Sequence, residues 1–411
     1  MTDEEIFAAM QAQYAMSDGL LAYSFGSPER TQARASTAPQ PMYADLAAHC
    51  PVEHHAPGMY SAYSMEDVLF LNKHHEVRQG VTYLGSTRAA IPLGLDGEEH
   101  RKYRRLLDPV FAPRRIASLE GQIRQYAHEM IDAFIDTGSV EAYKQWCELL
   151  PSTVFLSIMG LPMKDRDSFI GFKNRILGTD RADTLTPEQI MGQRMEAVIW
   201  MQNYFTEDLD AREQEATQRD DMTSWLLNAE VDGERLGRQE VLDILGLLMI
   251  AGLDTVAGSL ACFLSFLARH PEHRARIVTD PSVLPSAVEE LMRVESPVVE
   301  GTRRVVADLT LPSGTMVPAG SYIMVSWAGC NADAAAFPNP LEVDFDRNPN
   351  AHIGFASGFH RCLGSHLARM ELRVAMEVWH ERLPDYAVAD GVELTYSGNP
   401  RAPRVLPLVW N

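Results

Sequence analysis

The stretch GFASGFHRCLG, from Gly354 to Gly364, decides how this sequence is interpreted. It is a loop punctuated by glycines that carries a cysteine, Cys362, to the start of a predicted helix. A thiol in that position lies near the positive end of a helix dipole and near unpaired backbone N–H groups, and both favour the thiolate. The thiolate is the form of cysteine that acts as a nucleophile or a metal ligand. Two alternatives are a small buried residue without chemistry and a nucleophile with His360 or His366 as its base.

Helical patterns dominate the chain on both sides of this loop. The segment from about Gly364 to Leu383 is amphipathic and is followed by Pro384, so we expect a helix that ends there. The segment Gln239–His270 is apolar nearly all round, which predicts a long helix through the centre of the protein. A further helix is expected to begin at Thr186–Gln189, which combines an N-cap, a proline and a capping-box glutamine.

Strand-like stretches are few and short, so we expect a minor β-sheet in a mainly α-helical protein. They are Leu309–Leu311 with Thr315–Val317, Tyr322–Val325, and Val405–Val409. Residues 1–41 end in a polar, proline-containing run and are predicted to form an irregular N-terminal arm. Residues 42–411 are predicted to form a single domain with an α-rich lobe and a smaller β-rich lobe.

Composition and charge exclude several classes of protein. The chain has 411 residues, with 36 Lys and Arg against 56 Asp and Glu, and its net charge of −20 disfavours binding to nucleic acid. The longest uncharged apolar stretch, Ile244–Leu253, is about half the length of a membrane span. Five scattered cysteines and an N-terminus without signal-peptide features suggest a reducing compartment. We therefore expect a soluble, cytoplasmic protein.

The loop around Cys362 resembles the haem-binding loop of the cytochrome P450 monooxygenases. The matching residues are Phe355, Gly358, His360, Cys362 and Gly364. Three further motifs resemble that family and follow in its order: the helix motif in Asp96–Arg105, the oxygen-activation motif Ala251-Gly252-x-Asp254-Thr255, and the E-x-x-R motif from Glu290 to Arg293. The resemblance extends from about Asp96 to Trp410. Four ordered motifs make a coincidence very improbable.

The resemblance implies a cytochrome P450-like fold in which a long central helix lies over haem b. Cys362 would be the axial ligand of the haem iron, and a thiolate ligand favours O–O cleavage in this family. Phe355, Gly364 and Ala251 would also line the haem site, and His360 would be a second hydrogen-bond donor on the propionate side. His100 and Arg104 would hold one haem propionate, because an arginine fork suits a carboxylate. Arg303 would approach the other propionate, with Arg304 as the alternative.

Catalytic roles follow from the same resemblance. Asp254 and Thr255 would deliver the two protons that cleavage of dioxygen consumes, and Gly252 would leave room for oxygen. The alternative for Thr255 is that its hydroxyl bonds back to the helix backbone and only bends the helix. Glu290 and Arg293 would be structural residues rather than catalytic ones.

The substrate pocket is assigned only by analogy with the family, and its candidate residues are apolar or aromatic. They are Leu247, Leu248, Val298, Val299 and Tyr396. These side chains imply a hydrophobic substrate, although core packing explains each position equally well. Two residues of the cysteine loop depart from the family pattern, namely Ala356 and Phe359.

The sequence therefore predicts a monooxygenase that uses O2 and inserts one oxygen atom into a small hydrophobic substrate by hydroxylation or epoxidation. Electrons from NAD(P)H would arrive indirectly, through a separate acidic ferredoxin and its reductase. We expect this ferredoxin to bind a basic patch that includes Arg101, Arg105, Arg114, Arg115 and the neighbourhood of Arg361. The alternatives are a peroxide-driven peroxygenase and a non-catalytic haem-binding protein.

Overall fold

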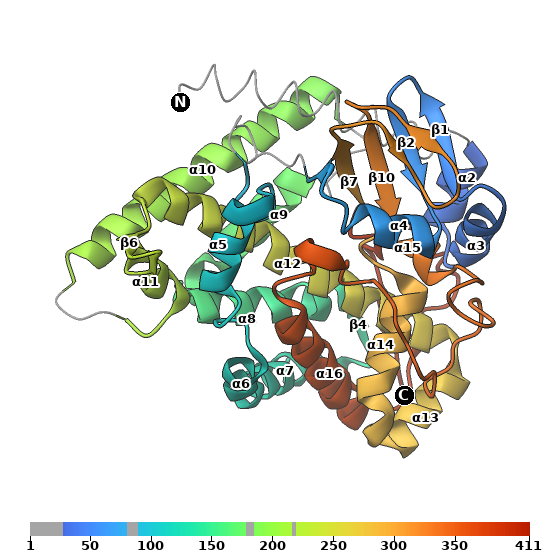
Figure 1. Ribbon diagram of the computed structural model, residues 1–411. Coiled ribbons are helices and arrows are strands. Elements are labelled where there is room, and N and C mark those ends of the chain that lie inside the picture. Colours follow the sequence, from blue (N-terminus) through green and yellow to red (C-terminus); the bar gives the residue numbers. More distant parts are fainter. Residues whose placement is uncertain (1–27, 80–88, 178–184, 216–218) are drawn as a thin grey trace. The chain divides into compact units, whose positions relative to one another are not determined.

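A computed structural model describes residues 28–79, 89–177, 185–215 and 219–411 (Figure 1). The chain divides into two compact units, each made of segments that are distant in sequence. Of the described residues, unit 1 comprises 79, 89–110, 151–177, 185–215 and 219–254, and unit 2 comprises 28–78, 111–150 and 255–411. The division passes through the central helix between Asp254 and Thr255.

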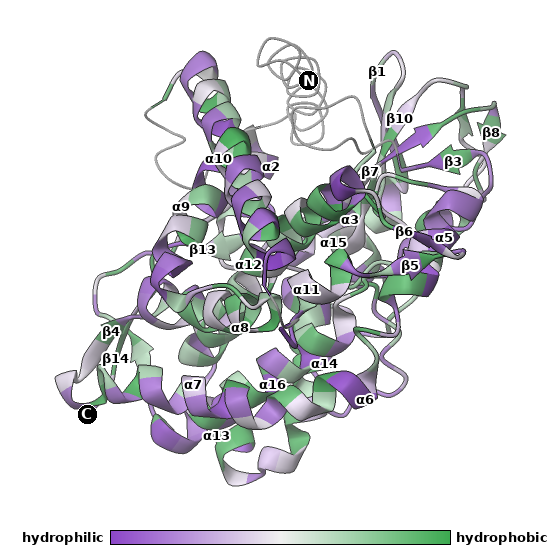
Figure 2. Ribbon diagram, turned by 90° about the vertical axis from the view of Figure 1, so that its left-hand side faces the viewer, coloured by the Kyte–Doolittle hydropathy of each residue, from purple (hydrophilic) through white to green (hydrophobic). Residues whose placement is uncertain are grey.

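Unit 1 is built mainly from helices. They are α5 (Gly97–Leu107), most of α8 (Leu149–Met159), α9 (Arg166–Leu177), α10 (Pro187–Glu213), α11 (Met222–Leu227) and the first half of α12 (Arg238–Arg269). A short hairpin of β5 (Glu230–Val231) and β6 (Glu234–Arg235) lies among them. The predicted capping box of α10 is confirmed, because Thr186 and Gln189 each accept a hydrogen bond from the other's backbone N–H. Hydrophilic and hydrophobic residues alternate around α10 (Figure 2).

Unit 2 contains nearly all of the described strands. Its largest sheet has the order β1-β2-β10-β7-β3, with β10 parallel to β2 and all other pairs antiparallel. The strands are β1 (Val52–Ala56), β2 (Met59–Ala62), β3 (Val77–Arg78), β7 (Glu300–Val305) and β10 (Tyr322–Ser326). Ala62, Ile323 and Val325 pack beneath the sheet against Val68 and Leu71 of α4 (Met65–Leu71). Of these five strands only β10 was predicted from the sequence, whereas β1, β2, β3 and β7 were not.

The remaining strands of unit 2 form small sheets. One contains β4 (Ser139–Glu141), β11 (Ala387–Val388) and β14 (Pro407–Val409), and two hairpins pair β8 (Leu309–Thr310) with β9 (Met316–Val317) and β12 (Tyr396–Ser397) with β13 (Ala402–Pro403). The helices of unit 2 are α2 (Pro28–Ala35), α3 (Gln40–His49), α4, α6 (Pro113–Ile116), α7 (Glu120–Asp132), the second half of α12, α13 (Pro271–Thr279), α14 (Leu284–Glu295), α15 (Trp327–Asn331) and α16 (Ser365–Arg382). Single helical turns of other types lie at Ala117–Leu119, Ile135–Thr137, Tyr143–Cys147, Met163–Asp165, Pro281–Val283 and Gly358–His360.

The prediction of an irregular arm was wrong for residues 28–35 and 40–41, although residues 36–39 are irregular. Residues 28–35 form α2, and α3 begins at Gln40. The prolines that suggested irregular chain stand in the first turns of these helices, where a proline is tolerated because those N–H groups have no helical partner. Arg34 also ties α2 to the rest of unit 2, through an ion pair to Glu300 with an N–O distance of 2.9 Å. The part of the arm before Pro28 lies outside the described residues.

The central helix α12 is confirmed, one residue longer at its start than predicted. Its side chains are buried along both halves, including Ile244 and Met249 in unit 1 and Leu260 and Phe263 in unit 2. By length and hydropathy α12 is apolar enough to cross a membrane, but two thirds of its apolar window is buried inside the protein. Such burial is typical of a core helix.

Candidate functional site

The cysteine loop is held in a defined shape within unit 2. Cys362 donates its backbone N–H to the carbonyl of Phe355 at 2.9 Å, which closes the loop. Gly358 has a φ of +70°, and a Cβ there would collide with the backbone carbonyl of Asn72. The side chain of Asn72 also donates to the hydroxyl of Ser357 at 3.0 Å. Only glycine satisfies both the backbone angle and this close approach.

The thiol of Cys362 differs from the other four in its accessibility. Cys147, Cys262 and Cys330 are buried, Cys50 is half-buried, and Cys362 is exposed. Burial raises the pKa of the buried thiols and of Cys50, which favours the unreactive protonated form. The loop therefore presents one accessible sulfur, as a haem-iron ligand requires. Helix α16 begins at Ser365, so Cys362 precedes the helix by three residues instead of opening it.

Ala356 occupies a backbone conformation that glycine would adopt without strain. Its φ is +56°, in the left-handed region where a Cβ costs about 1–2 kcal/mol. We expect Ala356→Gly to raise the free energy of unfolding by roughly 1 kcal/mol, because relief of the strain exceeds the added entropy of the unfolded chain. Urea denaturation measures this change. The control is Ala351→Gly, because Ala351 does not have a positive φ and its replacement by glycine should lower the free energy of unfolding. Equal effects of the two variants would show that the backbone of Ala356 is not strained.

The predicted propionate-binding residues are distributed over both units. In unit 1, His100 is buried on α5, while Arg104 is partly buried and pairs with Asp108 at 2.7 Å. In unit 2, Arg303 of β7 is buried and donates to the side-chain oxygen of Asn72 at 2.9 Å. Arg304, one residue along the strand, is exposed. This strand alternation favours Arg303 over Arg304 as the residue that faces inward.

His360 and the two remaining loop positions lie beside the cysteine. His360 ends the short turn Gly358–His360, Phe355 is half-buried, and Gly364 is the residue that precedes α16.

The guanidinium of Arg369 stacks on the ring of Phe355, 4.2 Å from its centroid. Arg369 also binds the carboxylate of Glu289 at 2.6 Å. Burial disfavours the charge on Glu289, but hydrogen bonds from His352 and Arg369 lower its pKa to about 2.

The oxygen-activation motif lies on α12, and its carboxylate has a partner that sequence analysis missed. Asp254 accepts from the ammonium of Lys173 on α9 at 3.0 Å, and both side chains are essentially inaccessible. In the sequence, Lys173 stood out only because it lies between Phe172 and Ile176 in a predominantly apolar part of its helix. Both partners belong to unit 1. A buried ion pair of this kind is costly to break from either side.

Gly252 has a packing role that the sequence did not reveal. A Cβ on Gly252 would approach the ring of Phe155 on α8 to 2.7 Å, which is closer than real contacts allow. Close helix packing in unit 1 therefore requires glycine here, independently of any room needed for oxygen. Ala251, its neighbour, is exposed.

One side of α12 is less covered than the rest of the helix. Leu247, Leu248, Gly252 and Thr255 are partly exposed and Ala251 is exposed, although their neighbours on the helix are mostly buried. These residues recur at helical spacing, so they share one face. An apolar, accessible face on a core helix fits a haem and a hydrophobic substrate, and the accessible thiol of Cys362 fits the iron.

The other pocket candidates behave differently from one another. Val298 is partly exposed, Val299 is buried, and Tyr396 is buried in the core of unit 2. The hydroxyl of Tyr396 hydrogen-bonds to that of Ser265 at 2.7 Å, and the guanidinium of Arg401 lies 4.0 Å from its ring centroid. The structure thus gives Tyr396 a packing role.

Glu290 and Arg293 form the expected buried network in unit 2. Arg293 donates two hydrogen bonds to Glu290, at 2.7 and 2.9 Å, and others to the backbone carbonyls of Asn331 and Pro340. Arg347 also donates to Glu290. Burial alone would raise the pKa of Glu290, but its bonds to Arg293 lower it. The pair binds α14 to the loops that precede the cysteine, which is a structural role.

Comparisons with known proteins agree with this geometry. The family model described as Cytochrome P450 matches residues 58–379. The chain is 35% identical over 325 residues to "Mycinamicin IV hydroxylase/epoxidase" of Micromonospora griseorubida, covering 77% of this chain and 79% of that protein. It is 32% identical over 322 residues to "Methyl-branched lipid omega-hydroxylase" of Mycobacterium bovis, covering 77% and 74%. The solved structure of the bacillaene polyketide synthase cytochrome P450 PksS of Bacillus subtilis 168 is similar at a TM-score of 0.81 and 26% identity, covering 91% of this chain and 97% of that one.

Proposed function

This chain belongs to the cytochrome P450 family, and from that premise we propose that it hydroxylates or epoxidises a small hydrophobic substrate with Cys362 as the axial haem ligand. As a P450 monooxygenase it is an oxidoreductase that uses haem b, and the haem supplies the activation of O2. Electrons from NAD(P)H reach it indirectly through redox partners. We further propose a cytoplasmic location.

The observation that carries the proposal is the exposed sulfur of Cys362 at the end of a closed loop. In this proposal His100 and Arg104 in unit 1, and Arg303 and His360 in unit 2, hold the haem carboxylates by charge-assisted hydrogen bonds. Asp254 and Thr255 hold and transfer the protons that reduction of O2 consumes. The chain's own residues therefore position the cofactor and supply protons.

The substrate class rests on apolar side chains and on the relatives. Leu247, Leu248, Ala251 and Val298 offer accessible apolar surface, which would bind a hydrophobic compound by removing its surface from water. One relative is named for oxidising mycinamicin IV and another for oxidising the omega position of a methyl-branched lipid. Both names denote hydroxylation, and the lipid named in the second supports a hydrophobic substrate for this chain.

The variant Thr255→Ala tests the proposed activity. It should bind a spin-shifting substrate nearly as the parent does, yet divert most electrons to hydrogen peroxide, because proton supply is impaired. The measurement is product formed per NAD(P)H consumed, in the presence of redox partners. Unchanged coupling would contradict the role of Thr255. Faster turnover with peroxide alone would favour a peroxygenase, and a lack of turnover of every spin-shifting compound would favour a non-catalytic haem protein.

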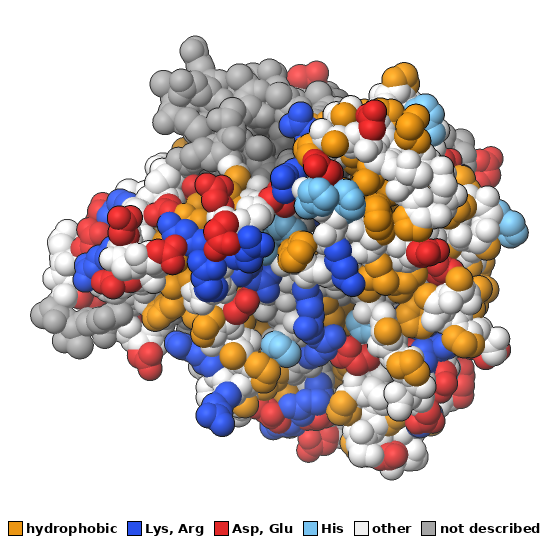
Figure 3. All heavy atoms as spheres, viewed as in Figure 1, with side chains coloured by type: hydrophobic (Ala, Val, Ile, Leu, Met, Phe, Trp, Pro, Cys, Tyr) orange, Lys and Arg blue, Asp and Glu red, His pale blue; other side chains and the backbone are white. Residues whose placement is uncertain are grey.

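The electron donor is proposed to be an acidic ferredoxin that binds unit 2 near Cys362. Arg114 and Arg115 of α6 are exposed, and neither has an ion-pair partner within the described ranges. Helix α6 contacts α16, which follows the cysteine loop. Figure 3 shows Lys and Arg side chains over this region. Phe359, in the loop itself, is 59% exposed and could contribute an aromatic contact of the kind enriched at interfaces.

The structure makes Arg101 and Arg105 weaker candidates than sequence analysis suggested. Both pair with the carboxylate of Glu98 at 2.9 Å, and Arg105 also lies 3.7 Å from Asp232. These acidic neighbours largely cancel the positive charge that an acidic partner would meet.

Charge reversal on α6 is expected to slow reduction more than charge reversal on α5. The double variant Arg114→Glu, Arg115→Glu should slow reduction by ferredoxin about tenfold or more at low salt, because complementary charge accelerates association. The matched control is Arg101→Glu, Arg105→Glu. Stopped-flow reduction over a range of salt concentrations measures both. The proposed docking surface is wrong if reduction by the true partner is unaffected by the α6 variant and by salt.

A further inference from the structure

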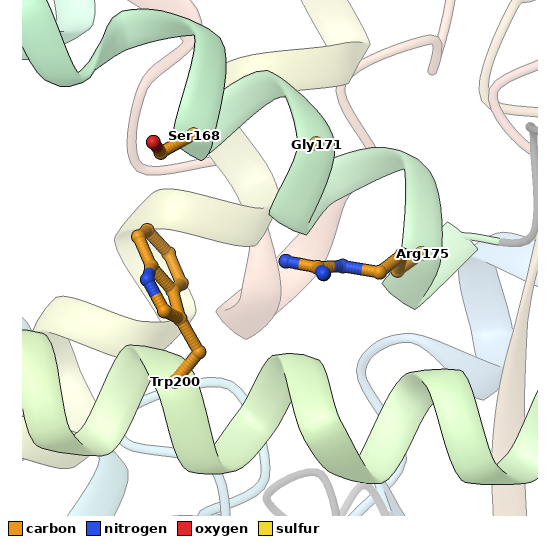
Figure 4. A pocket seen from close by; sticks show the side chains of 4 residues that line it. All are labelled: Ser168, Gly171, Arg175 and Trp200. Carbon is orange, nitrogen blue, oxygen red and sulfur yellow. The ribbon is translucent and has the colours of Figure 1, made fainter.

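A crevice lies between α9 and α10 of unit 1, and none of the motifs identified in the sequence contributes a residue to it. Its volume is about 480 Å³, and it is lined by Ser168, Gly171 and Arg175 of α9 and by Trp200 of α10. Figure 4 shows the guanidinium of Arg175 extending between the two helices and the indole of Trp200 rising towards α9. The crevice is large enough for a small organic molecule.

The crevice faces away from the oxygen-activation motif. Ser168, Gly171 and Arg175 are spaced by three and four residues, so they share one face of α9. Lys173, whose ammonium contacts Asp254, is two residues away from both Gly171 and Arg175 in the sequence. Two residues correspond to a rotation of about 200° around an α-helix, so Lys173 lies on the opposite side of α9 from both. Helix α9 thus directs one face to Asp254 and the opposite face to the crevice. A ligand in the crevice would not contact the reacting atoms.

Arg175 is the polar group that needs a partner. It has no hydrogen bond or ion pair among the residues that the structure describes, and its Nε atom is buried. A position in the last turn of α9 suits a cation, because the helix dipole is negative there. The helix dipole stabilises the positive charge of Arg175, but it provides no acceptor for the buried Nε–H group. A buried N–H group without an acceptor costs free energy. An anion in the crevice would supply this acceptor.

The other three residues specify the rest of the ligand. Trp200 offers an aromatic surface, and its ring also lies against the rings of Phe169, Phe172 and Tyr204. A Cβ placed on Gly171 would meet nothing within 4 Å, so this part of the helix surface is open to a ligand. A single guanidinium matches a single carboxylate bidentately, and the indole matches a flat apolar body. We propose that the α9–α10 crevice binds an aromatic carboxylate, at a site separate from the haem.

The test uses haem-loaded protein with excess imidazole, which occupies the iron and removes binding at the reaction site. The probe is 4-fluorophenylacetate, observed by the broadening of its ¹⁹F resonance. Saturable broadening is expected with the parent protein. Arg175→Gln should weaken binding at least tenfold, because a charge-assisted pair is lost. The uncharged 4-fluorophenylacetamide should not saturate.

A second variant, at Gly171, tests the site without altering the charge of Arg175. Gly171→Leu should fill the open space and abolish binding without harming the fold, since leucine is the better helix former. Its control is Gly121→Leu in α7 of unit 2, where a Cβ also meets nothing within 4 Å and binding should persist. The carbon monoxide spectrum of each variant reports intact haem loading. The proposal is overturned if the parent shows no saturable binding, if Arg175→Gln binds as tightly as the parent, or if the amide binds equally well. These results do not depend on whether the proposed monooxygenase activity is found.

Discussion

Replacing Cys362 by His should abolish the red-shifted, thiolate-type absorption band of the reduced, carbon-monoxide-bound protein and remove its monooxygenase activity. Imidazole can bind iron but lacks the electron donation of a thiolate, which favours O–O cleavage in this family. The exposed sulfur and the closed loop around it are the structural basis for this expectation. The change should leave the folding of unit 2 nearly intact, because the Cys362 side chain is not part of its core.

The control for this experiment is Cys50→Ser, which alters another non-core thiol far from the loop in sequence. That variant should keep both the absorption band and the activity. In haem-free protein, Cys362 should also react with a thiol reagent faster than the buried cysteines. A Cys362→His protein that retained the thiolate-type band would exclude Cys362 as the ligand.

The second large effect is expected at the buried ion pair of unit 1. Lys173→Met should lower the free energy of unfolding by about 3–5 kcal/mol, because it leaves the carboxylate of Asp254 buried without its cation. Asp254→Asn should also lower the free energy of unfolding, because it leaves the ammonium of Lys173 buried without its carboxylate. The double variant Lys173→Met, Asp254→Asn removes both charges and should recover much of the loss.

Urea denaturation of the four proteins forms a double-mutant cycle. The cycle isolates the coupling of Lys173 to Asp254 from other effects of each substitution. A coupling energy near zero, with the two single costs simply adding, would show that the ion pair does not hold α9 to α12. The surface pair of Arg101 with Glu98 provides a control cycle, because exposed ion pairs contribute little.

Helices with strong local signals were predictable from sequence. The start of α10 and both limits of α12 and α16 agree with expectation to within one or two residues, because capping residues, prolines and apolar periodicity are properties of the local chain. The short helix α2 and the strands β1, β2, β3 and β7 were missed. Their stability comes from contacts with distant segments, such as the pairing of β10 with β2 and the ion pair of Arg34 with Glu300.

By itself, the sequence determined the family resemblance, the helical class and the residues that could carry chemistry, because ordered motifs and local periodicity are written along the chain. Only the tertiary structure showed that Lys173 is the partner of Asp254, that Arg303 is buried while Arg304 is exposed, and that Glu98 pairs with both Arg101 and Arg105. Each of these outcomes depends on which side chains meet across space. The free energy of a charge is set by its burial and its neighbours, and neither can be read from the order of residues alone.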